Sequence, residues 1–133
     1  MKKRAVNPPQ MQPVSDLYHI SQAIRVGDTI WVSGQVGVDA AMTPAKGVEA
    51  QARLAFQNLK VVLEAAGASM ADVVEMTIFH TELGNEVETF LRVKDEFIAA
   101  PYPAVTGIGV AHLALPELVL EIRAIAVVGS GQA

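Results

Sequence analysis

The sequence contains no cysteine, which excludes disulfide bonds, thiolate nucleophiles and cysteine-ligated metal sites together. Histidines are also few: His19, His80 and His112 are the only three, and none forms a His-x-x-x-His pattern. The Gly107-Ile-Gly109 stretch lacks the third glycine and the following helix of a dinucleotide-binding motif. We therefore expect neither a metal site nor a cofactor.

Long apolar runs and an excess of positive charge are absent as well. No run of about 18 apolar residues occurs, so we predict no transmembrane helix and no membrane partner. The basic start at 1–4 is not followed by the apolar segment of a signal peptide, which favours a cytoplasmic protein. Since phosphate binding needs clustered Lys and Arg, the net charge of −4 argues against nucleic acid as the main partner.

The chain has the composition of a globular protein. Its 133 residues, 51% of them hydrophobic, predict a single domain over 1–133 with a two-layer core. Residues 1–16 are rich in proline and show little periodicity, so we expect an extended N-terminal arm there.

Hydrophobic periodicity predicts the element order β-β-α-β-α-β-β. Gly67 is expected to stop the first helix, and Pro101 and Pro103 to end the second. Gly34 is expected to end the second strand, and the last two strands to pair as a hairpin joined by a short turn. The predicted strands are 18–25, 29–33, 72–80, 103–113 and 118–127, and the predicted helices are 48–66 and 85–99.

This order favours an α+β fold in which two helices pack on one face of a mixed five- to six-stranded sheet. The strand at 118–127, however, is apolar on both faces, and such a strand must be covered on both sides. We expect other subunits to cover the second face. The alternative is a curled sheet whose small residues leave little apolar surface exposed.

Glu121 is the one acid in that apolar strand, with Arg123 two residues further along the same face. A buried carboxylate is costly unless it has a partner or a chemical role. Glu121 is therefore a candidate catalytic residue, and the alternative is a structural ion pair with Arg123.

The chain contains, in this order, the stretches Ser33-Gly34-Gln35, Glu64-Ala65-Ala66-Gly67 and 121–127. In their order and approximate spacing, these stretches resemble the RidA (YjgF) family of reactive-imine deaminases. The resemblance implies a chorismate-mutase-like α+β fold. It also implies a homotrimer with small-molecule ligand clefts at the subunit interfaces.

The resemblance further implies hydrolysis of enamines and imines such as 2-aminoacrylate. Carried over position by position, the family's water-holding glutamate falls on Glu121, and its arginine, which binds the substrate carboxylate, falls on Val105. Its tyrosine falls on Ile20 and its asparagine on Leu91. The other ligand-pocket residues expected from the resemblance are Ser33, Gly34, Thr106, Gly107 and Arg123.

The loss of the arginine is the most informative departure from the family pattern. A guanidinium binds a carboxylate through two charge-assisted hydrogen bonds, and valine at position 105 offers none. The sequence therefore favours hydrolytic deamination of an enamine, imine or related metabolite other than the usual 2-aminoacrylate. The alternative is a non-catalytic trimer that binds a small ligand. A ribonuclease or translation-inhibitor activity ranks below both, because it conflicts with the net charge of −4.

Overall fold

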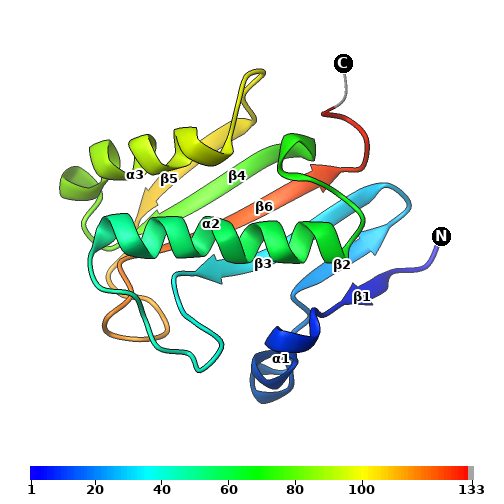
Figure 1. The fold of residues 1–133 in the computed structure, drawn as a ribbon, viewed down its shortest axis with the longest axis horizontal. Helices are drawn as coiled ribbons and strands as arrows, with labels where there is room; N and C mark the ends of the chain where they lie inside the picture. The colour runs from blue at the N-terminus through cyan, green and yellow to red at the C-terminus, as the bar shows by residue number, and fades with distance from the viewer. Residues whose placement is uncertain (132–133) are drawn as a thin grey trace.

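A six-stranded sheet in the order β1-β2-β3-β6-β4-β5 runs through the computed structural model, which describes residues 1–131 (Figure 1). β4 and β5 are parallel and every other pair is antiparallel, so the predicted mixed sheet is confirmed. The strands are β1 (Arg4–Val6), β2 (Ala23–Val26), β3 (Thr29–Val36), β4 (Val73–His80), β5 (Ala104–Gly109) and β6 (Leu120–Val127). The helices are α1 (Gln12–Tyr18), α2 (Val48–Ala65) and α3 (Leu83–Phe97), with short 3-10 turns η1 (Pro9–Met11) and η2 (Met70–Asp72).

The two long helices, α2 and α3, lie together on one face of the sheet, as the sequence predicts (Figure 1). The apolar stripe of α2 is buried against the sheet, and its Phe56 stacks on Phe90 and Phe97 of α3, with ring centroids 5.7 and 5.0 Å apart. Gly67 follows the end of α2 with φ at +91°, a conformation that favours glycine and stops the helix. Within residues 1–131 no helix is both long and apolar enough to span a membrane.

The N-terminal segment is not the extended arm that the prolines predicted. It contains β1, which pairs with β2 at the sheet edge, then η1 and α1. Each of these helical segments has proline in its first turn. The prediction was wrong because proline is tolerated at that position, where its missing N–H has no partner to lose.

The first two strand predictions were wrong in their boundaries. Tyr18 ends α1, His19 adopts a left-handed conformation with φ at 55°, and β2 begins only at Ala23. β3 does not end at Gly34 but continues to Val36. Its pairing with β6 shifts in register between Val32 and Gln35. A bulge of this kind accommodates the glycine inside the strand, and the pairing resumes beyond it.

The predicted C-terminal hairpin is also wrong, because β4 lies between β5 and β6. The connection from β5 to β6 crosses the end of β4, where the Val110 amide donates to the His80 carbonyl at 2.8 Å. Just before β6, the Val119 carbonyl accepts a hydrogen bond from the Thr81 amide at 3.0 Å. β5 pairs in parallel with one side of β4 and β6 pairs with the other side, so the strand–turn–strand pattern did not produce a hairpin.

The side chains of β6 show how the two faces of the sheet differ. Alternate residues, from Leu120 to Ala126, are buried beneath the helices, whereas no helix within residues 1–131 covers the face that includes Glu121. On this open face Trp31 is 39% exposed and Ile108 is 40% exposed. The open face is therefore apolar and uncovered in the single chain, and its burial by other subunits stays a prediction.

One polar side chain ties the loops around the sheet to α2. Gln51 is buried; its amide donates to the carbonyls of Ala45 and Glu117 at 2.9 and 2.8 Å, and its oxygen accepts from the Val119 amide at 2.9 Å. We expect Gln51→Leu to lower the free energy of unfolding by about 3 kcal/mol or more, because three backbone groups lose their partner. Urea denaturation measures this, with Gln57→Leu, at an exposed position of α2, as the control. Equal losses in both variants would contradict the expectation.

Candidate functional site

Glu121 lies half-buried on the open face of β6, and its carboxylate is packed across Gly34 of β3. A Cβ added at Gly34 would overlap with the carboxyl group of Glu121, so a glycine is required there for the acid to keep its position. The predicted Ser-Gly stretch and the predicted acid are thus brought into contact, although Glu121 comes 87 positions after Gly34 along the chain.

The Glu121 carboxylate forms no ion pair within the described part of the chain. Arg123 is exposed, so the alternative of a structural pair between the two residues finds no support in residues 1–131. Burial without a compensating charge raises the pKa of Glu121 above its ordinary value. The result is a carboxylate whose basicity is increased and whose oxygens are free to accept a proton.

This shift predicts how stability depends on pH. Because the pKa of Glu121 is higher in the folded than in the unfolded chain, the folded state binds more protons and the wild type loses stability as pH rises from below 4.5 through the folded pKa. Glu121→Gln removes this loss. We expect the free energy of unfolding of Glu121→Gln, relative to wild type, to increase between pH 4 and pH 7. Urea denaturation at constant ionic strength measures it, and a difference that does not change with pH would refute it.

A pocket of about 290 Å³ adjoins Gly34 and contains Ile20. Its walls come from α1, β3, α2 and the loop after β3, and they are mainly apolar. The Asn58 amide of α2 holds that loop by donating to the carbonyls of Val36 and Val38 at 2.9 and 3.0 Å. The lining residues are Gln10, Met11, Val14, Ile20, Gln22, Gly34, Gln35, Val36, Val38, Asp39, Ala40, Met42, Leu54 and Asn58. The structure thus brings Ile20 and Gly34 together.

Ser33 takes part in the hydrogen bonding of the sheet. Its hydroxyl donates to the carbonyl of Ser21 at 2.7 Å, and its amide donates to the carbonyl of Gln22 at 2.9 Å. Both groups hold the segment before β2 against β3, so Ser33 supports the position of Gly34 in this structure.

The remaining predicted site residues divide between the two faces of the sheet. Val105 pairs with Met76, which is buried beneath the helices, so Val105 and the alternate residue Gly107 face α3. Thr106 pairs with Thr77, which also pairs with Arg123, so these residues share the open face with Glu121. Within one chain, Glu121 and Val105 therefore lie on opposite faces of the sheet.

His80 is engaged in a buried contact at the start of α3. Its Nδ1 lies 3.0 Å from the carboxylate of Glu86, which also accepts from the amide of Glu82 at 2.6 Å and from the hydroxyl of Thr81 at 3.3 Å. This arrangement anchors the N-terminus of α3 beside β5. In the part of the chain that the structure describes, no group of three or more acidic or histidine side chains is placed to hold a metal ion.

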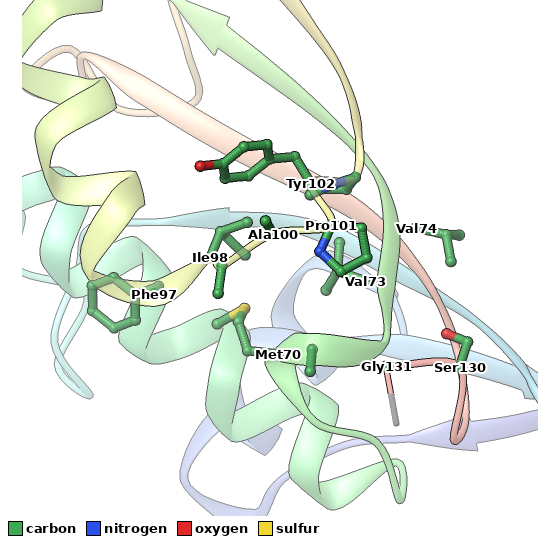
Figure 2. Close-up of a pocket in the computed structure, with 13 residues that line it drawn as sticks. Met70, Val73, Val74, Phe97, Ile98, Ala100, Pro101, Tyr102, Ser130 and Gly131 are labelled. Atoms are coloured by element: carbon green, nitrogen blue, oxygen red, sulfur yellow. The ribbon is translucent and has the colours of Figure 1, made fainter. Parts of the chain in front are cut away.

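A second cavity, of about 530 Å³, lies near the C-terminal end of α3 and contains none of the predicted site residues (Figure 2). Tyr102 lines it, and the ammonium of Lys94 lies over the Tyr102 ring, 5.5 Å from the centroid. Lys94 has no role in the sequence-based prediction. The available signal was its spacing: it falls four residues after Phe90, on the apolar stripe of the helix.

Comparisons with known proteins agree with this architecture. A family model described as Endoribonuclease L-PSP matches residues 12–128. The RutC family protein YjgH of Escherichia coli is 42% identical over 86% of this chain and 88% of its own. The 2-iminobutanoate/2-iminopropanoate deaminase of Dermatophagoides farinae is 36% identical over 95% of this chain and 97% of its own. The solved structure of protein YJGH superposes with a TM-score of 0.88 at 40% identity, covering 96% of this chain and 98% of that one.

Proposed function

The chain belongs to the RidA (YjgF) family, with its chorismate-mutase-like fold, and we propose on this basis that it hydrolyses a small imine or enamine and releases ammonia. The observation that carries the proposal is the carboxylate of Glu121, half-buried, without an ion-pair partner in residues 1–131 and packed on Gly34. The deaminase name of the Dermatophagoides farinae relative supports the same reaction class.

The proposed reaction needs one group of the protein that accepts a proton. A water oxygen attacks the iminium carbon while Glu121 takes one of the water protons, which forms a tetrahedral carbinolamine. Glu121 then returns that proton to nitrogen. The C–N bond breaks as Glu121 accepts the hydroxyl proton and the carbonyl forms, and the departing ammonia takes up that proton as ammonium. Burial favours this role, because it raises the pKa of Glu121 and so makes the carboxylate a stronger base at neutral pH.

We propose that the site is completed between subunits of a homotrimer. Glu121 and Val105 lie on opposite faces of the sheet, so a pocket that contains both needs the second one from another copy of the chain. The open apolar face, with Trp31 and Ile108 exposed, supplies a surface for such an assembly. The residues proposed to line the cleft are Ile20, Ser33, Gly34, Leu91, Val105, Thr106, Gly107 and Arg123.

The apolar residues of the cleft favour a substrate other than 2-aminoacrylate. Ile20, Leu91 and Val105 stand where the family pattern has polar groups, and each is exposed in the single chain. An imine with an apolar side chain would bury surface against them, worth about 25 cal/mol per Å².

The test is ammonia release from imines that an amino-acid oxidase generates in situ from alanine, leucine and phenylalanine. We expect the protein to accelerate release, and most for the larger apolar side chains. Release at the rate of buffer with all three would overturn the deaminase proposal. Light scattering tests the trimer separately, and a monomer at micromolar concentration would refute the inter-subunit cleft.

The apolar pocket beside Gly34 favours a second candidate, a trimer that binds a small apolar or aromatic ligand without turnover. A thermal-shift screen separates the two. Stabilisation by aromatic or acyl compounds together with no ammonia release would establish binding alone. RNA cleavage has no support in a net charge of −4.

A further inference from the structure

Lys94 on α3 is a largely buried lysine that forms no ion pair within residues 1–131. The residue is only 8% exposed, and none of the ion pairs within residues 1–131 involves it. Its ammonium is placed over the face of Tyr102, an attraction weaker than pairing with a carboxylate. Because no carboxylate within residues 1–131 pairs with it, the Lys94 charge is available to an anionic ligand.

The ammonium keeps a route to solvent. Every side-chain nitrogen or oxygen that is sealed from solvent within residues 1–131 has a hydrogen-bond partner. The Lys94 ammonium has no such partner there, so its nitrogen is not fully sealed from solvent. The stem of the side chain is packed while the charged end keeps some exposure, an arrangement common for lysine.

Lys94 belongs to the side of α3 that faces β5. It lies eleven residues, or about three helical turns, after Leu83, so the two side chains share one stripe. A Cβ at Gly107 or Gly109 would meet Leu83 at 3.9 or 3.8 Å, which shows that this stripe covers β5. Leu91, three residues before Lys94, is on the adjoining part of the same side.

Lys94 is also near the level of Val105 along the strand. Eleven helical residues span about 16 Å, which is about the length of five strand residues. α3 runs antiparallel to β5 (Figure 1), so counting back from Gly107 and Gly109 places Lys94 over the start of β5. The contact with Tyr102, three residues before Val105, agrees with this level.

We propose that Lys94 supplies the positive charge that position 105 lacks, and that it binds the carboxylate of an anionic substrate in the cleft. This inference rests on the proposed function and names its substrate class as a 2-imino acid. A lysine ammonium binds a carboxylate as a point charge rather than as a fork, which tolerates a wider range of orientations than an arginine would. Lys94 would therefore select for the negative charge, while the apolar residues around it select the side chain.

Calorimetric titration tests the proposal without turnover. Pyruvate, a stable 2-oxo acid, is compared with its uncharged amide, pyruvamide, on wild type, Lys94→Met and Lys60→Met, the last at an exposed lysine of α2. We expect wild type and Lys60→Met to bind pyruvate more tightly than pyruvamide. In Lys94→Met, pyruvate binding should weaken at least tenfold and pyruvamide binding should not change.

Equal pyruvate affinity in Lys94→Met and wild type would overturn the proposal, as would a wild type that binds pyruvate no more tightly than pyruvamide. If Lys94→Met does not fold, wild type with ¹³C-dimethylated lysines provides the measurement. Pyruvate must then shift the Lys94 signal, and an unmoved signal refutes the site. Because the readout is binding, failure to hydrolyse imines would overturn the deaminase proposal and leave this result standing.

Discussion

Glu121→Gln is expected to lower ammonia release from an imine by about a hundredfold or more, the range for loss of a positioned general base. Glutamine keeps the size of the side chain and its position over Gly34 but cannot accept the proton of the attacking water. The measurement is the initial rate of ammonia formation at saturating and at low imine concentration. We expect the loss in kcat, since the interaction with the proton exists only in the transition state.

Glu75→Gln is the matched control, because Glu75 of β4 is an exposed acid that lies opposite β6 on the same open face as Glu121. It should retain wild-type activity. Equal rates in wild type and Glu121→Gln would remove the acid from the mechanism. A loss of equal size in both variants would show that charge on this face, rather than the carboxylate of Glu121, governs the rate.

Val105→Arg is expected to raise hydrolysis of 2-iminopropanoate about tenfold, equivalent to about 1.4 kcal/mol of transition-state stabilisation. Val105 is 44% exposed at the sheet edge, so the longer side chain can reach solvent, and a guanidinium adds two parallel hydrogen bonds to a carboxylate. The proposed trimer should persist. The measurement is kcat/KM for the imines of alanine and leucine, together with light scattering.

The control is Leu17→Arg, which adds the same charge at an exposed apolar residue of α1, outside both cavities, and should leave kcat/KM unchanged. In the Lys94→Met background the gain from Val105→Arg should exceed tenfold, because the arginine then replaces the positive charge that Lys94 is proposed to supply beside position 105. A folded trimeric Val105→Arg protein with no gain would contradict the expectation. That result would show that Leu91 and Ile20 shape the pocket for another ligand.

Much of the fold followed from local patterns. The i, i+3, i+4, i+7 stripe predicted α2 and the placement of two helices on one face, because one apolar stripe needs one apolar surface to cover it. The glycine after α2 stopped the helix as expected, since φ at +91° suits glycine alone. The patterns failed at the N-terminus, where proline fits the first turn of a helix as well as it fits an extended arm.

The candidate site was predictable only in part. The short stretches around Gly34 and Glu121 pointed to the family, and alternation along β6 put Glu121 and Arg123 on one face. The contact between Gly34 and the Glu121 carboxylate was beyond reach of such reasoning, because it depends on how β3 and β6 pair. Lys94 was overlooked because a single lysine on an apolar stripe looks the same whether its ammonium reaches solvent or lies buried.

The sequence by itself determined the family, the α+β class, the long helix α2 and the identity of the acid, because these depend on residue type and on spacing along one segment. Only the tertiary structure decided that β4 lies between β5 and β6, that Glu121 and Val105 occupy opposite faces, and that Lys94 is buried over Tyr102. The physical reason is that these features arise from contacts between segments far apart in the chain. Strand order and sheet face are set by pairing and burial across the whole sheet, which no local pattern encodes.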